Sequence, residues 1–257
     1  TSLSGRTAAP APVSRIDTAA LSEDTERRVG ELAAREGGSP ATAVVAAFAA
    51  YLAQMTGQTD VVLSLPVAAR TTAVLRRSGS MVSNVVPLRL SVTDDTTVHD
   101  LIAASAAAVS GALRHQRYRH EDIVRDRDAG PVGQSTFFGP WVNIMLFDNE
   151  VRLGDMVGGI NILSTGLIED LGVNVYRSGG AHTHIDFESN PNLYRSEQSR
   201  ADHARFIEFF DRFVGSDPER CVWDIPLAGR AELDDAVIEW NRTDHPVRQR
   251  DMLAQFR

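Results

Sequence analysis

Short apolar runs of strand length, separated by longer segments with helical patterns, constrain the fold of this chain most. Runs of this kind are typical of buried strands, and the alternating ones are typical of strands with one covered face. Ser178-Gly179-Gly180 stands between two alternating runs and indicates a β-hairpin. We expect strands at 61–67, 81–92, 141–147, 171–176 and 181–188.

The helical segments begin at residues that commonly cap helices. Serine, threonine and Ser-Pro steps satisfy the first backbone N–H groups, and glycine often follows the last turn. A Gly-, Asp- and Pro-rich loop is expected over roughly 126–140. Helices come first and are then mixed with strands, which predicts an α/β layered domain with a partly antiparallel sheet. We expect helices at about 23–36, 40–54, 97–116 and 195–214.

Composition excludes several classes of chemistry. All 26 basic residues of the 257 are arginine, so no mechanism that needs a lysine of this chain applies, including Walker-A phosphate binding and Schiff-base formation. A single cysteine, Cys221, rules out an intrachain disulfide and a Cys-x-x-Cys site. The net charge of −8 argues against a general nucleic-acid binder, and no apolar run reaches membrane-span length.

The two ends of the sequence look like connecting segments. Residues 1–13 are rich in Ala, Pro, Ser and Thr and lack a signal-peptide core, so a linker is expected there. Residues 241–257 are polar and then turn apolar, which resembles the start of a further element. We therefore expect the chain to be a piece of a longer protein.

One histidine cluster deserves a metal-site hypothesis. His182, His184 and Asp186 alternate along an expected strand, so their side chains point to one face. The competing interpretation is the solvent-facing polar side of a half-buried strand, whose other face carries Thr183 and Ile185. We favour that second interpretation and expect no metal site.

Isolated polar residues in apolar strands form a second set of candidates. Asn84 and Arg89 lie in one such stretch, and Asn143 lies in another. A buried amide needs hydrogen-bond partners, so these residues either bond to a neighbouring loop or line a polar channel. A basic segment at 114–122 either contacts an acidic partner or is a solvated helix end.

Several ordered motifs carry a family resemblance. The chain resembles the second half of a condensation domain of a nonribosomal peptide synthetase, the enzymes of peptide antibiotic biosynthesis, and residues from Trp240 onward resemble the linker into an adenylation domain. The matching stretches are Leu65-Pro-Val-Ala-Ala-Arg70, Gly79-Ser-Met-Val-Ser-Asn84-Val-Val-Pro-Leu-Arg89, His115-Gln116-x-Tyr118-x-x-Glu121-Asp122, Phe138-Gly-Pro-Trp-Val-Asn143, Asp170-Leu-Gly-Val-Asn-Val-Tyr176 and Asn190-Pro-Asn-Leu-Tyr194.

The sequence also departs from this family. The His-His-x-x-x-Asp-Gly hallmark of the first half is absent, so no catalytic residue is assigned and the chain alone is expected to be inactive. Arg119 and His120 replace the usual Pro-Phe. Two alternatives stay open: a non-catalytic module that binds a partner or tailoring enzyme, and an epimerization or heterocyclization relative.

The resemblance implies an architecture and a set of partners. It implies a chloramphenicol-acetyltransferase-like C-terminal lobe at 14–228, with mixed sheet and packed helices, and a linker towards a following domain at 229–257. This lobe would form one wall of a tunnel where a carrier-bound amine attacks a carrier-bound thioester. Asn84, Arg89 and Asn143 are expected at the tunnel or lobe interface, and Arg117 and Arg119 at a carrier contact.

The same resemblance sets the remaining expectations. The implied partners are the N-terminal lobe, peptidyl carrier proteins and an adjacent adenylation domain, with neither nucleic acid nor membrane. No cofactor is expected to bind directly, because phosphopantetheine is presented by the carrier proteins. The implied location is cytoplasmic.

Overall fold

The first long helices start where the sequence predicted, and a side-chain cap is present at each start. The hydroxyl of Ser22 accepts a hydrogen bond from the backbone N–H of Thr25 at the start of α1 (Glu23–Arg35). Reciprocal capping boxes begin α2 (Pro40–Thr56) and α4 (Val98–Arg114). Gly57 ends α2 with a φ of 68°, the left-handed conformation in which glycine is least strained. The helices predicted in this part of the chain are therefore confirmed.

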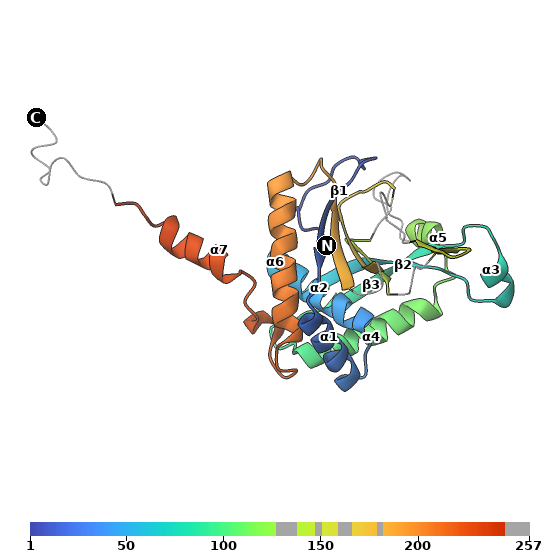
Figure 1. Cartoon of the computed structure of the whole chain (residues 1–257), viewed down its shortest axis with the longest axis horizontal. Helices are drawn as coiled ribbons and strands as arrows, with labels where there is room; N and C mark the ends of the chain where they lie inside the picture. The colour runs from blue at the N-terminus through green and yellow to red at the C-terminus, as the bar shows by residue number, and fades with distance from the viewer. Residues whose placement is uncertain (127–137, 147–150, 159–165, 179–181, 245–257) are drawn as a thin grey trace, which may run out of the picture. The chain divides into compact units, whose positions relative to one another are not determined.

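The computed structural model describes residues 1–126, 138–146, 151–158, 166–178 and 182–244, and divides into the units Thr1–Leu227 and Ala228–Arg257. A six-stranded sheet with order β1-β8-β7-β4-β2-β3 forms the centre of the first unit (Figure 1). β4 runs parallel to β2 and β7, and the other neighbouring strands are antiparallel, so the predicted mixed sheet is confirmed. Its strands are β1 (Arg15–Ala20), β2 (Asp60–Val67), β3 (Asn84–Ser91), β4 (Trp141–Met145), β7 (Leu171–Ser178) and β8 (His182–Ser189).

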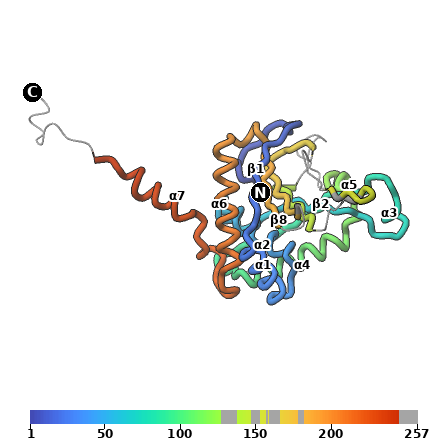
Figure 2. The backbone as a smooth tube through the Cα atoms, in the orientation of Figure 1, coloured from blue at the N-terminus to red at the C-terminus, as the bar shows by residue number. Residues whose placement is uncertain are grey.

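Helices cover one face of this sheet. In Figures 1 and 2, α1, α2, α4 and α6 (Ser196–Val214) gather on one side of the strands. Alternate strand residues point into this helical layer, and they join the helices in one apolar core. An aromatic cluster at its centre joins α2, β8 and α6, with Phe206 lying 5.2–5.4 Å from the rings of Phe48, Tyr51 and Phe187. The sheet therefore has one helical face and one open face, meaning the face that these helices do not cover.

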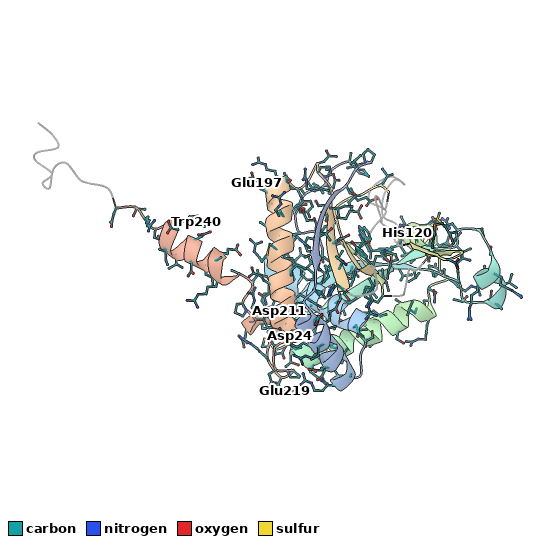
Figure 3. All side chains as sticks on the ribbon, in the orientation of Figure 1. Asp24, His120, Glu197, Asp211, Glu219 and Trp240 are labelled. Atoms are coloured by element: carbon teal, nitrogen blue, oxygen red, sulfur yellow. The ribbon has the colours of Figure 1, made fainter. Side chains whose placement is uncertain are left out.

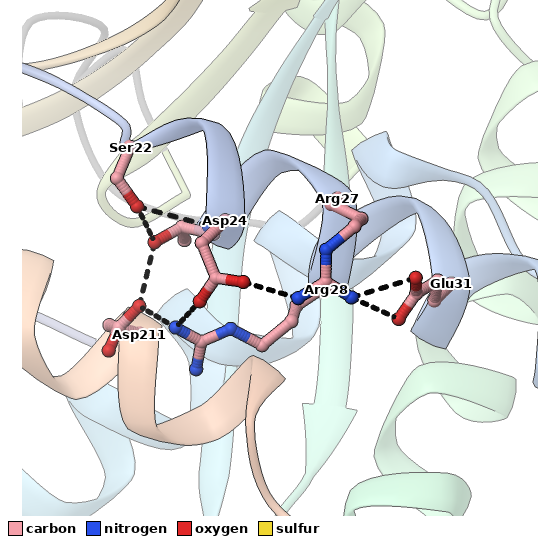
Figure 4. Close-up of polar contacts among 7 residues, drawn as sticks. Ser22, Asp24, Arg27, Arg28, Glu31 and Asp211 are labelled. Atoms are coloured by element: carbon pink, nitrogen blue, oxygen red, sulfur yellow. Dashed lines mark hydrogen bonds and ion pairs between the residues drawn. The ribbon is translucent and has the colours of Figure 1, made fainter.

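A polar network fastens α1 to α6 at the edge of the helical layer. Thr25 Oγ1 donates to Asp211 Oδ1 at 2.7 Å, and Arg28 donates to the same oxygen at 3.1 Å (Figure 4). Arg28 also pairs with Asp24, within α1. These exposed or partly exposed pairs set the orientation of two helices and add little stability individually.

Some elements differ from the sequence-based expectation. β1 was not predicted, because its alternation is weak and its pairing with β8 depends on distant residues. The third strand begins at Asn84 rather than at Met81. The short helices α3 (Ala73–Arg77) and α5 (His120–Asp126) and the two-stranded pair β5 (Val151–Leu153) and β6 (Met156–Gly158) were also missed. Most of the predicted loop at 126–140, and the hairpin turn at 179–181, lie outside the described residues.

The described part of the second unit, residues 228–244, contains α7 (Arg230–Asp234) followed by the π-helix η2 (Asp235–Glu239). Within residues 228–244, the large apolar side chains of Leu233, Val237, Ile238 and Trp240 are exposed. Trp240, labelled in Figure 3, is 77% exposed. Across the described part of the chain, no helix is long and apolar enough to cross a membrane.

Candidate functional site

Polar side chains follow one another across the open face of the sheet. Strand alternation places Asn143 of β4, Asn174 of β7 and Glu188 of β8 on this face, opposite the helical core. Asn174 is 3% exposed and Glu188 is fully buried, whereas Asn143 is half-buried. The open face is therefore a largely buried polar surface rather than an ordinary solvated one.

Two hydrogen bonds join these three residues into a ladder. Asn143 Nδ2 donates to Asn174 Oδ1 at 3.2 Å, and Asn174 Nδ2 donates to Glu188 Oε2 at 3.3 Å. Asn143 and Asn174 are direct register partners in the parallel pair β4–β7, which brings their side chains together. We call Asn143, Asn174 and Glu188 the amide ladder.

A second polar row lies beside the amide ladder. Tyr176 donates its hydroxyl to Asp186 Oδ1 at 3.3 Å, and its ring stacks on His184 with centroids 5.4 Å apart. Burial raises the pKa of the Asp186 carboxyl above its usual range, against the lowering effect of hydrogen bonds from Thr18 and Tyr176. Burial and the neighbouring Asp186 carboxylate raise the pKa of Tyr176 to about 12.

The structure corrects the interpretation of the histidine cluster. Asp186 was expected on a solvent-facing side, but it is only 7% exposed because β1 and β7 pair with β8 on both sides. His182 is exposed and His184 is half-buried. Among the described residues, no three His, Cys, Asp or Glu side chains are grouped so that they would hold a metal ion.

Trp141 closes one end of the open face. Its indole ring lies against Gly172, its register partner, where a Cβ atom would come within 2.0 Å of the ring. Ala11 and Ile168 pack on the same ring, and their backbones pair through two hydrogen bonds of 2.9 and 3.0 Å. Part of the 1–13 segment thus covers the Trp141 end, while the expectation that it is a linker stays a prediction.

Asn84 does not lie on the open face with the amide ladder. It falls on the side of β3 that carries Val86 and Leu88, which face the helical core. Its Nδ2 donates to the carbonyl oxygens of Gln116 at 3.0 Å and Tyr118 at 2.7 Å, and its Oδ1 accepts from the backbone N–H of His120 at 3.0 Å. These contacts favour the structural alternative, in which Asn84 holds the turn between α4 and α5.

Arg89 is an exposed residue of the edge strand β3, two strands away from β4 in the sheet order. Its guanidinium makes a two-pronged ion pair with Asp60, at 2.9 Å from Nε to Oδ1 and 2.8 Å from Nη2 to Oδ2. The structure therefore does not bring Asn84, Arg89 and Asn143 onto one surface.

Arg117 and Arg119 are exposed in the turn between α4 and α5. His120, labelled in Figure 3, begins α5 directly after this turn. Its ring packs edge-on against Phe138, with centroids 5.1 Å apart. A groove of about 490 Å³ lies beside the turn, between β3 and α4, and Tyr118 and Ile123 line its end. The basic segment is therefore both the end of a helix and an accessible surface.

Sequence reasoning missed Asn174 and Glu188. Asn174 falls within the stretch 170–176, but nothing in its spacing distinguishes a ladder member from a solvated residue. Glu188 reads as one polar position of an alternating strand. Their burial depends on β1, the strand that the sequence did not predict, which completes the sheet beside β8.

The sequence matches the model of the condensation domain family over residues 5–228. The chain belongs to this family. Condensation domains are parts of nonribosomal peptide synthetases, and the match covers all of the described sheet and its helical layer. The predicted family is thereby confirmed.

Full-length relatives place the condensation domain in large synthetases. The chain is 30% identical over 228 residues to the dimodular nonribosomal peptide synthase of Bacillus subtilis, covering 88% of this chain and 10% of that protein. It is 34% identical over 229 residues to the isonitrile lipopeptide synthase of Streptomyces coeruleorubidus, covering 86% and 15%.

Solved condensation domains share the fold. The first condensation domain of the calcium-dependent antibiotic synthetase, solved with a substrate analogue, superposes with a TM-score of 0.79 at 32% identity. A mutant of the starter condensation domain of rhizomide synthetase, solved in complex with C8-CoA, gives 0.76 at 34% identity. The matches cover 89% and 88% of this chain but 50% of each solved chain, so this chain spans about half their length. The expected chloramphenicol-acetyltransferase-like fold is confirmed.

Proposed function

We propose that this chain is the C-terminal lobe of a condensation domain, and that its open face is one wall of the tunnel in which an amide bond forms. A buried row of polar groups on the sheet face opposite the helical layer supports this assignment most strongly. Buried amides and carboxylates cost free energy unless they are hydrogen-bonded, and here they bond to one another along the face. Such a surface fits a lining for polar, tethered reactants.

The wall acts by positioning and by excluding water. A carrier-bound amine and a carrier-bound thioester that meet in one tunnel react as if they were parts of one molecule. Dry walls also limit hydrolysis of the thioester. Asn143 is the ladder member that is half-buried, so it is the one we assign to contact the reactants. The histidine motif would come from the N-terminal lobe.

The proposed partners follow from this assignment. Carrier proteins present the reactants on phosphopantetheine, and we place a carrier contact at Arg117 and Arg119. Residues 229–257 would lead towards an adenylation domain, and the whole synthetase would work in the cytoplasm. Asn84 and Arg89 are the less direct candidates, since one holds a turn and the other pairs with Asp60 at the sheet edge.

The test is amide formation from two loaded carrier proteins. The chain is assayed alone and again joined to the N-terminal half of its condensation domain, with the amide product measured by mass spectrometry. The joined form is expected to make the amide, and the chain alone is expected to make none. Amide formation by the chain alone would overturn the lobe assignment. A joined, folded form with an intact histidine motif and no product would overturn the tunnel-wall function.

A further inference from the structure

We propose that Asn174 and Glu188 are positioning residues that act through Asn143, fixing its side-chain amide so that its carbonyl oxygen receives an N–H of the attacking amine. This inference rests on the proposed function and names the chemical group that the wall contacts. It concerns two buried residues, on β7 and β8, that lie behind the half-buried Asn143.

The sheet register allows Glu188 to act on Asn143 through Asn174, and we call this chain of contacts the relay. Asn143 lies directly opposite Asn174 in the parallel pair β4–β7. Glu188 lies opposite Gly172 in the antiparallel pair β7–β8, one same-face step along the strand from Asn174. The Trp141 ring occupies the space above Gly172, and the Glu188 carboxylate bonds diagonally to Asn174 at 3.3 Å. The three groups thus span three neighbouring strands, with Asn143 directly beside Asn174 and Glu188 one diagonal step further along.

The hydrogen bonds of the amide ladder all run in one donor-to-acceptor direction, towards Glu188. A carboxylate only accepts hydrogen bonds, so Asn174 turns its NH₂ towards Glu188. That leaves the Asn174 oxygen for Asn143, which must in turn donate its own NH₂. The carbonyl oxygen of Asn143 is then turned away from the ladder, and among the described residues it has no hydrogen-bond partner. An acceptor is thereby presented on the open face.

An acceptor at this position suits an amine nucleophile. An N–H of the acceptor amine can donate to the Asn143 oxygen, which leaves the nitrogen lone pair to be aimed at the thioester carbonyl. The C–N bond forms as the C–S bond breaks, the electron pair of that bond leaves with sulfur, and one amine proton is finally carried by the released thiol. Asn143 takes no proton in this scheme; it orients the nitrogen.

Burial argues that Glu188 is more than a packing residue. Its side chain is fully buried in the sheet, where a charged or polar group loses hydration. An apolar residue, such as its neighbour Phe187, would fill the strand without that penalty. A carboxylate at the end of the ladder does what an apolar residue cannot, because it sets the direction of both amides.

The test is a double-mutant cycle in the two-lobed domain that contains this chain. Glu188→Gln keeps the shape of the side chain but supplies a donor as well as an acceptor, so the ladder loses its direction. We expect kcat for amide formation to fall about ten- to a hundredfold, with KM for the loaded acceptor carrier nearly unchanged. In an Asn143→Ala background the same change should cost less than about twofold, because its target is gone.

Two further variants keep the test decisive. Asp202→Asn is the matched control: Asp202 is also a buried carboxylate, but it lies on α6 and pairs with Arg205 at 2.8 Å. It should lower the melting temperature and leave kcat per folded molecule unchanged. Asn174→Ala removes the middle of the ladder and replaces Glu188→Gln if that variant does not fold.

The outcomes separate this inference from the function on which it rests. If Glu188→Gln lowers kcat equally in the wild-type and the Asn143→Ala backgrounds, the relay is overturned. It is also overturned if the loss of activity is fully explained by a lower melting temperature. Wild-type protein without amide product would instead overturn the proposed function, and the relay with it. A normal wild type with an unaffected Glu188→Gln variant would overturn only the relay.

Discussion

Asn84 joins β3 to the turn between α4 and α5 through hydrogen bonds to three backbone groups, and it is only 7% exposed. Replacing it by alanine leaves two carbonyl oxygens and one N–H, in part-buried contacts, without their partner. We expect Asn84→Ala to lower the free energy of unfolding by about 1–3 kcal/mol, measured by denaturant titration. Ser91→Ala, at an exposed position of the same strand, is the control and should change it little.

Asp186 gives a pH-dependent prediction. Burial raises its pKa in the folded chain above the unfolded value, so the folded state favours the protonated carboxyl. That stabilisation is fully present below the unfolded pKa and is lost as the pH rises through the folded pKa. Asp186→Asn mimics the protonated form, keeps an oxygen for Tyr176, and should therefore raise the melting temperature at neutral pH.

The gain from Asp186→Asn should shrink as the pH falls below the ordinary range of an aspartate, about 4. Melting curves recorded across an acid-to-neutral series measure this difference directly. Asp94→Asn, at an exposed turn, is the control. A difference between wild type and Asp186→Asn that stays constant with pH would contradict the assignment of a raised pKa.

At the level of single residues, the sequence nominated Asn84 and Asn143 as site candidates on the same grounds. Each is an amide in an apolar strand, and periodicity alone does not reveal which face of the sheet the helices cover. The bonds of Asn84 to the 116–120 turn and of Asn143 to β7 depend on pairings between distant segments. Site residues could therefore be nominated from the sequence, but not separated by role.

Aromatic side chains pack the helix α6 against α2 and the strand β8. Phe206 is fully buried, and its ring lies 5.4 Å from Phe48, 5.2 Å from Tyr51 and 5.3 Å from Phe187. We expect Phe206→Ala to lower the free energy of unfolding by about 3–5 kcal/mol, because it removes these contacts and leaves a cavity. Trp240→Ala, an aromatic truncation at a 77% exposed position, should leave it nearly unchanged.

The turn between α4 and α5 gives a prediction about binding. Arg117 and Arg119 are exposed there, and an acidic carrier surface would be attracted to them. Arg117→Glu with Arg119→Glu should raise KM for a carrier protein about tenfold, leave kcat unchanged, and lose most of its effect at high salt. Arg200→Glu on α6 is a matched charge reversal. The same KM for the turn variant and the wild type would contradict a carrier contact at the turn.

Elements with strong local signals could be predicted, and those that depend on pairing could not. The capped helices α1, α2 and α4 begin where Ser22, Ser39 and Thr97 place them. β1 is an edge strand whose residues carry no clear pattern, and its place beside β8 is fixed only when the sheet forms. Because β1 was not predicted, the burial of Asp186 and Glu188 on the neighbouring strand β8 was not predicted either.

At the scale of the whole molecule, one sheet carries two different surfaces. The helical face is an apolar core, whereas the open face carries the amide ladder and the Tyr176–Asp186 row. The solved condensation domains that resemble this chain are about twice its matched length, since the matches cover 50% of them. We propose that the other half of such a domain covers the open face and completes the tunnel.

The most direct test of that proposal is the single-turnover rate of amide formation by the two-lobed domain carrying Asn143→Ala, with both carriers loaded and saturating. Melting of the same variant is recorded alongside. A tunnel wall at the open face predicts a rate at least about tenfold lower, with a loss of unfolding free energy of about 1 kcal/mol or less, because only one hydrogen bond of a half-buried amide is removed. A large melting loss with an unchanged rate per folded molecule would contradict it.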